Sequence, residues 1–209
     1  MSKLANIKLK VCGLRDNITE VAALKPDFMG FICYDKSPRY IGKDFSNNLK
    51  NEAFKIGVFV NQPIDEVLDL AKKHRFDMVQ LHGNENVDYC VELKAYDLKI
   101  IKVFAGNKLP AQHEIDAFLP FVDYFLFDTK LETYGGTGMT FDWNNLKTLT
   151  IKKPIFLSGG LSLENIASIE ELNRLEIFAI DVNSKFEISP GRKDIEKLKS
   201  LKKMMTHEI

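Results

Sequence analysis

Short apolar segments alternate with amphipathic segments along the whole of this chain. Eight apolar runs have the length and the β-branched and aromatic content that are typical of strands. They are Ile7–Cys12, Phe28–Tyr34, Lys55–Val60, Met78–His82, Lys99–Phe104, Tyr124–Asp128, Ile155–Ser158 and Ile177–Asp181. These runs begin roughly 24 residues apart on average, which is the size of a compact βα unit.

The segments between these runs are predicted to be helices. Ile64–His74 carries apolar residues at Ile64, Val67, Leu68 and Ala71, the i, i+3, i+4, i+7 stripe of an amphipathic helix. Ser162 is expected to cap a helix over Leu163–Leu172. The remaining predicted helices are Asn17–Leu24, Phe45–Phe54, Val87–Leu93, Glu114–Leu119, Asp142–Leu149 and Asp194–Met204.

Eight βα units joined by right-handed crossovers close naturally into a (β/α)8 barrel. The alternative is a doubly wound open sheet, but such a sheet rarely sustains eight units this regular in so short a chain. The first predicted strand is also not followed by a G-x-G-x-x-G pattern, so a dinucleotide-binding fold has no support. Because no linker or low-complexity segment interrupts the rhythm, we expect one domain over residues 1–209.

Composition and charge narrow the classes of partner. The 209 residues include 29 basic and 29 acidic side chains, so net charge gives no reason to expect nucleic acid or a membrane surface as a partner. Three cysteines without CxxC spacing favour a reducing compartment over a disulfide framework or a zinc site. No apolar run reaches the length of a membrane span, and the N-terminus lacks the apolar core of a signal peptide. We therefore expect a cytoplasmic protein.

Polar residues end several of the predicted strands. Alternation along the first strand puts Lys10 and Cys12 on one face, opposite the apolar residues that would pack on the helices. In the sixth strand Asp128 shares a face with Tyr124 and Leu126, and in the eighth Asp181 shares one with Ile177 and Ala179. If these faces point inward, Cys12, Asp128 and Asp181 meet at the carboxyl end of the barrel, where such folds carry their chemistry.

Cys12 and Asp128 form a candidate acid/base pair. A thiolate can abstract a proton where positive charge lowers its pKa, and Lys10 and Arg39 are candidates for that charge. A carboxylic acid can donate a proton where burial or a neighbouring anion raises its pKa. The alternatives are that Cys12 is a small buried hydrophobic residue and that Asp128 caps a helix or lies in a surface loop.

Two loops are candidates for binding a phosphate. The turn Ser158-Gly159-Gly160-Leu161 presents backbone N–H groups ahead of a predicted helix, and Asn183-Ser184 follows the eighth strand in a similar way. In (β/α)8 barrels the loops after strands seven and eight often hold a phosphate together. Each pattern alone is also compatible with an ordinary turn.

Three further features have both a functional and an ordinary interpretation. Arg39, in Ser37-Pro38-Arg39, can hold a carboxylate through two hydrogen bonds or can be a solvated loop residue. His82 can pair with Cys12 as a thiol-activating dyad or can be a hydrogen-bonded wall residue. Gly135-Gly136-Thr137-Gly138 can be a lid or a simple connection.

Together these segments resemble the phosphoribosylanthranilate isomerase family, and the resemblance runs from Lys10 to about Asp194. No single motif is decisive, but their order along the chain is highly specific. The motifs are Lys-x-Cys-Gly at 10–13, Gly30-Phe31, Ser37-Pro38-Arg39, Gly-Val-Phe-Val-Asn at 57–61, Gln-Leu-His-Gly at 80–83, Phe127-Asp128, Gly135-Gly136-Thr137-Gly138, Phe141-Asp142-Trp143, Leu157-Ser158-Gly159-Gly160-Leu161, Asp181-Val182-Asn183-Ser184 and Pro190-Gly191-x-Lys193-Asp194.

The resemblance implies a (β/α)8 barrel, monomeric or homodimeric, that needs no cofactor and no metal. It implies the Amadori rearrangement of N-(5'-phosphoribosyl)anthranilate in tryptophan biosynthesis. Cys12 would be the general base and Asp128 the general acid. Arg39 would face the anthranilate carboxylate. The other implied substrate-binding residues are Gly159, Gly160, Asp181, Asn183 and Ser184.

Two positions depart from the family's usual pattern. Lys185 stands where members commonly have glycine, which affects the backbone of the loop after the eighth strand. Arg15 stands where many members have a small residue, and it would add positive charge near the thiol.

The rival functions are a histidine-pathway type of phosphosugar isomerase, a thiol hydrolase built on Cys12 and His82, and a binding barrel without activity. The first would use two carboxylates and a repeated half-barrel, which this sequence does not show.

Overall fold

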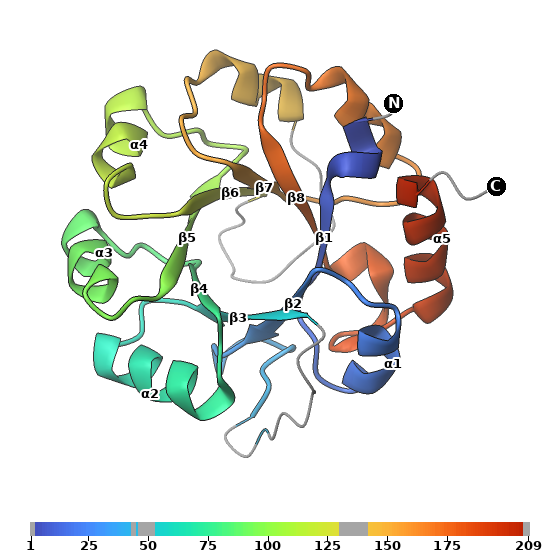
Figure 1. The fold of residues 1–209 in the computed structure, drawn as a ribbon, viewed down its shortest axis with the longest axis horizontal. Helices are drawn as coiled ribbons and strands as arrows, with labels where there is room; N and C mark the ends of the chain where they lie inside the picture. The colour runs from blue at the N-terminus through green and yellow to red at the C-terminus, as the bar shows by residue number, and fades with distance from the viewer. Residues whose placement is uncertain (1–2, 43–44, 46–52, 130–141, 207–209) are drawn as a thin grey trace.

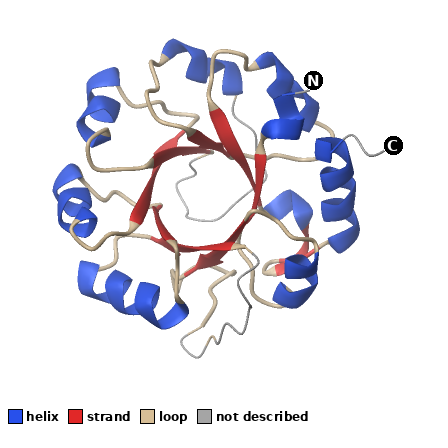
Figure 2. Cartoon of the chain, viewed as in Figure 1, coloured by secondary structure: helices blue, strands red, loops and turns tan. Residues whose placement is uncertain are grey.

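The computed structural model describes residues 3–42, 45, 53–129 and 142–206, and its strands form a closed barrel. Figure 1 shows the eight strands around a common axis with the helices outside them, and Figure 2 shows the same separation by element type. In order around the barrel, the strands are β1 (Lys8–Val11), β2 (Phe28–Ile32), β3 (Phe54–Phe59), β4 (Met78–Leu81), β5 (Lys99–Ala105), β6 (Tyr124–Asp128), β7 (Ile155–Leu157) and β8 (Ile177–Val182). All neighbouring pairs are parallel, and β8 closes on β1, so the predicted (β/α)8 barrel is confirmed.

The helices lie outside the barrel, and a small hairpin follows the last barrel strand. The α-helices are α1 (Ile18–Ala23), α2 (Ile64–His74), α3 (Val87–Lys94), α4 (Gln112–Phe118) and α5 (Ile195–Thr206). The 3₁₀ segments are η1 (Lys3–Asn6), η2 (Trp143–Thr148), η3 (Ile166–Glu171) and η4 (Ser184–Phe186). After η4, β9 (Glu187–Ser189) and β10 (Arg192–Lys193) pair as an antiparallel hairpin. Among the described residues, no helix is long and apolar enough to cross a membrane.

Two of the predicted helices are 3₁₀ segments instead. Asp142–Leu149 contains η2, and its Asn and Thr residues are weak helix formers. In Leu163–Leu172, Ser162 does not cap an α-helix. The side chain of Asn165 accepts a hydrogen bond from the Ser162 N–H at 2.8 Å and donates one to the Gly160 carbonyl at 3.0 Å. These bonds tie the segment back to the preceding turn, so only the short η3 follows.

Two predictions concern segments that the structure leaves largely or wholly undescribed. Most of the predicted helix Phe45–Phe54 lies outside the described residues, since 46–52 are not among them, and Phe54 begins β3. The glycine-rich segment Gly135-Gly136-Thr137-Gly138 lies wholly outside them.

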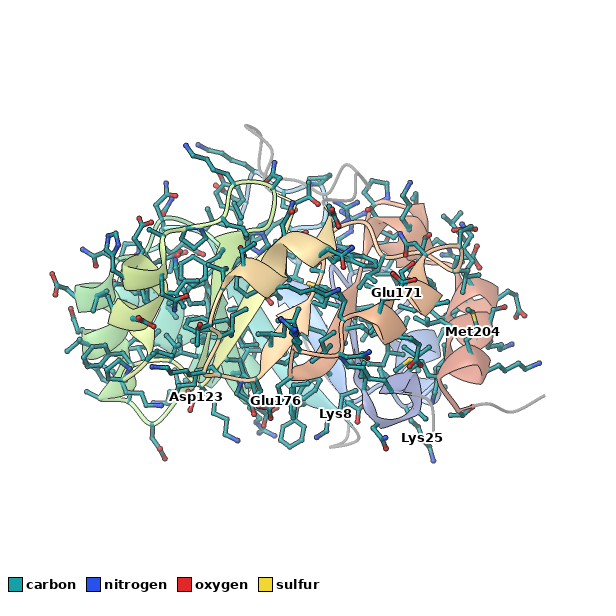
Figure 3. All side chains as sticks on the ribbon, turned by 90° about the horizontal axis from the view of Figure 1, so that it is seen from above. Lys8, Lys25, Asp123, Glu171, Glu176 and Met204 are labelled. Atoms are coloured by element: carbon teal, nitrogen blue, oxygen red, sulfur yellow. The ribbon has the colours of Figure 1, made fainter. Side chains whose placement is uncertain are left out.

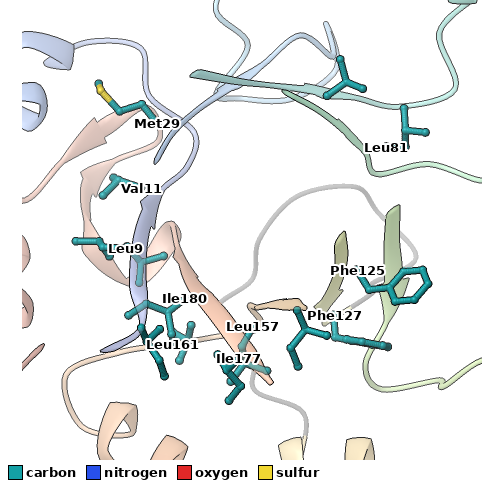
Figure 4. Packing of buried hydrophobic residues seen from close by; sticks show 14 of the residues in the cluster. Leu9, Val11, Met29, Leu81, Phe125, Phe127, Leu157, Leu161, Ile177 and Ile180 are labelled. Atoms are coloured by element: carbon teal, nitrogen blue, oxygen red, sulfur yellow. The ribbon is translucent and has the colours of Figure 1, made fainter. Parts of the chain in front are cut away.

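Alternation along the strands divides the apolar residues into two cores. The barrel interior is filled by Phe28, Ile56, Met78, Ile101, Val103, Leu126, Phe156 and Ala179. The residues between them along the strands pack outward on the helices. Figure 4 shows Leu9 and Val11 of β1 projecting away from the centre of the barrel, as predicted. The complementary face of β1 turns Lys10 inward, where its side chain is completely buried.

One residue breaks the predicted alternation in β8. Ile155 pairs with Ile177, but Phe156 pairs with Ala179, so Phe178 is an extra residue in β8. Because of this irregularity Ile177 belongs to the outer core, while Ala179 belongs to the inner one. The prediction that Ile177 faces inward with Ala179 and Asp181 is therefore wrong for Ile177.

The parallel strands all run toward the same end of the barrel. In the side view of Figure 3, Lys8, Asp123 and Glu176 lie along one edge of the molecule, and each lies at or just before the start of a strand. The carboxyl ends of β1, β6 and β8 consequently meet at the opposite edge. This end carries the polar residues discussed below.

Candidate active site

A buried ion pair forms the floor of the site. The register of β1 and β8 pairs Lys10 with Asp181, and Lys10 Nζ donates to Asp181 Oδ2 at 2.8 Å and also to Gln80 Oε1. Burial opposes the charge on Lys10, but the charge and the hydrogen bond of the Asp181 carboxylate act against this, and the pKa of Lys10 is raised. Loss of one partner of such a pair typically costs about 3–5 kcal/mol, because the other charge is left buried and uncompensated.

The two oxygens of Asp181 differ in their hydrogen bonding. Asp181 Oδ1 is buried and has no hydrogen-bond partner within the part of the chain that the structure describes. A buried carboxylate oxygen without a partner is costly, so a donor from a bound molecule would be favoured there.

Cys12 follows β1 and lies beside this ion pair. Its N–H donates to the Val182 carbonyl at 2.9 Å, which extends the pairing of β1 with β8 by one residue. Only 4% of the residue is exposed. Burial raises the pKa of the thiol to about 11, while Lys10 and Lys193 act in the opposite direction. Cys12 is therefore a neutral thiol at pH 7 in the ligand-free protein.

This raised pKa predicts how the thiol reacts with pH. The thiolate is the reactive form, so alkylation of Cys12 by iodoacetamide should speed up about tenfold per pH unit from pH 7 to pH 10. Quantitative peptide mass spectrometry separates Cys12 from the other two cysteines. A rate that levels off near pH 8.5, the usual thiol pKa, would contradict the raised value.

The Cys12 thiol lies over a glycine of the neighbouring strand. A Cβ atom added to Gly30 of β2 would lie 2.7 Å from Cys12 Sγ and 3.0 Å from Cys12 Cα, closer than van der Waals contact allows. Gly30 therefore provides the space in which the thiol lies.

Gly30→Ala should accordingly displace Cys12 and lower turnover. We expect kcat to fall at least tenfold, because a displacement of about 1 Å is enough to impair a reacting group. Overpacking should also cost about 1–3 kcal/mol of stability. Steady-state kinetics and thermal unfolding measure the two effects. Gly42→Ala is a control for kcat alone: an added Cβ there meets nothing within 4 Å, but alanine rarely adopts a φ of 83°, so this change should itself cost stability. A Gly30→Ala enzyme with wild-type kcat would show that this space is not required.

Asp128 ends β6 and lies at the mouth of the barrel, with 28% of its side chain exposed. Its Oδ1 accepts a hydrogen bond from the Thr129 N–H at 2.8 Å. Burial raises its pKa, although the hydrogen bonds from Thr129 and Ser158 and the charge of Lys10 act against this. A raised pKa suits a carboxyl group that must hold a proton before donating it.

A chain of side chains connects Lys10 to Asp128. Gln80 accepts from Lys10 through its oxygen, so its amide nitrogen donates to His82 Nδ1 at 2.9 Å. Burial and the charge of Lys10 lower the pKa of His82 to about 4, so the ring is neutral at pH 7. With Nδ1 accepting, the ring proton is on Nε2, which lies 3.6 Å from Asp128 Oδ2. His82 thus faces Gln80 and Asp128, and the Cys12–His82 dyad finds no support.

Arg39 is engaged by a carboxylate of the protein itself. Its guanidinium binds Glu187 of β9, with Nε at 2.9 Å and Nη2 at 2.7 Å from Oε2. Lys193, rather than Arg39, is the second cation that lowers the pKa of the thiol.

The expectation that Arg15 adds charge near the thiol is not met either. Its guanidinium binds Asp16 and the carbonyls of Pro38 and Pro190 at the surface.

The two predicted phosphate loops lie at the same end of the barrel, after β7 and β8. Gly159 and Gly160 both have positive φ, 90° and 74°, a conformation that favours glycine. Within the described residues, the 3₁₀ segment η3 and not an α-helix follows them, so the turn offers backbone N–H groups without an α-helix N-terminus behind them. Ser184 begins η4, and Asn183 Oδ1 accepts a hydrogen bond from Lys193 Nζ at 2.8 Å.

The sequence interpretation assigned no role to Gln80, Glu187 or Lys193. Gln80 and Lys193 lie in motifs that the chain shares with the family, but the pattern of residues did not indicate which groups they contact. Glu187 lies in a short segment after the last barrel strand, 148 residues from its partner Arg39. Nothing in the local sequence signals that contact.

Comparisons with known proteins find relatives that match almost the whole of this chain. Residues 9–204 match the family model described as N-(5'phosphoribosyl)anthranilate (PRA) isomerase. An N-(5'-phosphoribosyl)anthranilate isomerase of Parabacteroides distasonis is 38% identical over 206 residues, covering 95% of this chain and 93% of that protein. One from Petrotoga mobilis is 39% identical over 200 residues, covering 92% and 94%.

Solved structures of the same kind superpose over nearly the whole chain. The crystal structure of phosphoribosyl anthranilate isomerase from Thermotoga maritima has a TM-score of 0.79 at 31% identity, covering 97% of this chain and all of that one. A second structure, in complex with reduced 1-(o-carboxyphenylamino)-1-deoxyribulose 5-phosphate, has a TM-score of 0.76 at 29% identity, covering 96% and 99%. The Thermotoga maritima enzyme is described as dimeric in a structure of monomers generated from it.

The closed barrel, its polar carboxyl end and these relatives define a (β/α)8-barrel enzyme of the isomerase class. More narrowly, the chain belongs to the N-(5'-phosphoribosyl)anthranilate isomerase family.

Proposed function

We propose that this protein converts N-(5'-phosphoribosyl)anthranilate to 1-(2-carboxyphenylamino)-1-deoxyribulose 5-phosphate, an Amadori rearrangement of tryptophan biosynthesis. Family membership supports the reaction. One observation carries the assignment of roles: a thiol, Cys12, and a carboxyl group, Asp128, lie at strand ends around the same buried Lys10–Asp181 pair. Cys12 is the general base and Asp128 the general acid.

The reaction needs a proton donated to the ring oxygen, a proton removed from C2, and a final shift of a proton from the C2 hydroxyl to C1. Asp128 donates a proton to the furanose ring oxygen, the bond from that oxygen to C1 breaks, and C1 becomes an iminium carbon. The Cys12 thiolate then takes the proton from C2, and the electrons of that bond form a C1–C2 enolamine. A proton returns to C1 as the C2 hydroxyl becomes a ketone, so the redox change is internal to the substrate. Positioned groups carry out the first two proton transfers, and the last step is a tautomerisation of the enolamine to the ketone.

The electrostatics of the site support these roles. Burial raises the pKa of Asp128, which favours its acid form before ring opening. Burial also makes the Cys12 thiolate scarce but strongly basic. Lys10 and Lys193 both stabilise the thiolate, so the charge needed for ionisation is present within the protein.

Separate residues are assigned to bind the carboxylate and the phosphate of the substrate, on either side of its reacting atoms. Arg39 faces the anthranilate carboxylate, and Gly159, Gly160, Asn183 and Ser184 hold the phosphate through backbone and side-chain donors. Asp181 binds a sugar hydroxyl through Oδ1, the oxygen without a described partner. The two remote anionic groups would then hold the ribose between Cys12 and Asp128.

A fluorescence assay tests the proposed function. Freshly prepared phosphoribosylanthranilate is fluorescent, and its signal should fall on addition of the purified protein, with the ketose product identified by mass spectrometry. Heat-denatured protein is the control for spontaneous substrate decay. No enzyme-dependent fall in fluorescence would refute the proposal, and turnover of a different phosphoribosyl aminosugar would favour the histidine-pathway type of isomerase.

The proposal extends to organisation in the cell. The protein is a single-domain cytoplasmic enzyme that acts alone or as a homodimer, without nucleic acid or membrane partners. Light scattering with size-exclusion chromatography measures the oligomeric state, and cell fractionation measures the location.

A further inference from the structure

Arg39, in the loop after β2, and Glu187 of β9 form a buried pair. Arg39 Nε lies 3.0 Å from Oε1 and 2.9 Å from Oε2 of Glu187, and Nη2 lies 2.7 Å from Oε2. Only 6% of the Arg39 side chain and 4% of the Glu187 side chain are exposed. A loop arginine is usually solvated and changes rotamer freely. The hydrogen bonds that Arg39 donates to Glu187 restrict its rotamers instead.

Glu187 is itself held by two further donors. Lys193 Nζ lies 2.7 Å from Glu187 Oε1, and the Gly191 N–H lies 3.2 Å from the same oxygen. Burial alone would raise the pKa of Glu187, but the hydrogen bonds from Arg39 and Lys193 hold it below its usual range. The carboxylate is therefore a fixed anion that joins the loop after β2 to the β9–β10 hairpin.

This cluster lies directly against the residue that follows the thiol. Gly13 has a φ of 70°, and a Cβ on it would lie 2.7 Å from Arg39 Cδ and 2.6 Å from Asn183 Oδ1. Asn183 in turn accepts a hydrogen bond from Lys193. The side chain of Arg39 therefore lies beside Gly13, the residue that follows Cys12, while Glu187 binds its guanidinium.

The charges of Arg39, Lys193 and Glu187 indicate whether Glu187 itself could bind the substrate. Arg39 and Lys193 carry two positive charges and Glu187 one negative charge, so one positive charge remains. An anionic substrate group can therefore still be attracted to the cluster, but it would be repelled by Glu187 itself. Glu187 is not a substrate ligand, and any effect it has on binding must act through the groups it holds.

We propose that Glu187 is a positioning residue, which fixes the guanidinium of Arg39 in the orientation that receives the substrate's aromatic carboxylate. This inference rests on the proposed function and deepens it. Glu187 removes the rotamer freedom of Arg39 before the substrate arrives, so less conformational entropy is lost on binding.

A double-mutant cycle tests this role. Glu187→Gln, Arg39→Ala and the double variant are compared with the wild type by steady-state kinetics and by the calorimetric Kd of the reduced product analogue. We expect Glu187→Gln to raise KM and Kd about tenfold while kcat stays within about threefold, because ground-state binding is lost. On the Arg39→Ala background the same change should add less than about twofold, because the residue through which it acts is absent.

Controls separate positioning from general damage. Glu196→Gln removes an exposed glutamate of α5 that pairs with Lys199, and it should leave KM and Kd unchanged. If Glu187→Gln does not fold by circular dichroism, Glu187→Asp keeps the charge and shortens its reach, and it should raise KM in the same way.

The outcomes distinguish this inference from the proposed function. Additive effects of the Glu187 and Arg39 substitutions, or a folded Glu187→Gln or Glu187→Asp enzyme with wild-type KM and Kd, would overturn the positioning role while the isomerase activity stands. A wild-type protein that neither turns over phosphoribosylanthranilate nor binds the analogue would overturn both.

Discussion

Cys12→Ser should abolish nearly all turnover and leave the barrel folded. A serine hydroxyl is far too weak a base at neutral pH, so kcat should fall by at least about 10²–10⁴-fold, the range typical of general-base removal. The substitution is nearly isosteric, and the Cys12 N–H would still donate to the Val182 carbonyl. Stopped-flow or steady-state fluorescence with phosphoribosylanthranilate measures the loss, and circular dichroism checks the fold.

The chain offers a matched control for this experiment. Cys90 of α3 is also a free and completely buried cysteine, but it lies on the helical layer outside the barrel. Cys90→Ser buries a hydroxyl in an apolar environment and should cost about 1–3 kcal/mol of stability without lowering kcat. A Cys12→Ser enzyme with activity within a few-fold of the wild type would exclude Cys12 as the base.

Asp128→Asn should have the second-largest effect. The amide keeps the shape of the side chain, but it cannot donate the proton that opens the ribose ring. We expect kcat to fall by about 10²–10⁴-fold with KM within a few-fold of the wild type, because the proposed phosphate and carboxylate contacts remain. Steady-state kinetics separate the two parameters.

The same strand supplies the control for Asp128. Asp123 immediately precedes β6 at the opposite end of the barrel, where it pairs with Lys94 at 3.0 Å. Asp123→Asn removes an equal charge from the other end of the barrel and should leave kcat unchanged. Near wild-type turnover by Asp128→Asn would refute its assignment as the general acid.

The local sequence pattern was sufficient to predict the strands of this barrel. Each of the eight predicted strands is present, since a run of β-branched and aromatic residues buried on both faces is encoded within a few consecutive residues. The helices were less well predicted. η2 and η3 replace two of them, because hydrogen bonds such as that from the Ser162 N–H to Asn165 compete with helix extension.

The inward face of a strand was predictable only where pairing is regular. Lys10 of β1 faces inward as its alternation requires. Ile177 of β8 does not, because Phe178 is an extra residue opposite β7. Such a bulge depends on how two strands pair, so it has no signature in either strand alone.

The positions of Cys12 and Asp128 at the ends of strands in a parallel barrel could be predicted from sequence alone, because alternation and spacing are local properties of the chain. The groups that surround them could be known only from the folded protein. Lys10 meets Asp181 across 171 residues, and Arg39 meets Glu187 across 148. These contacts depend on the closure of β8 on β1 and on the position of the β9–β10 hairpin. The pKa of the thiol and the orientation of the arginine follow from burial and from charges brought together in space, and no short segment of sequence encodes them.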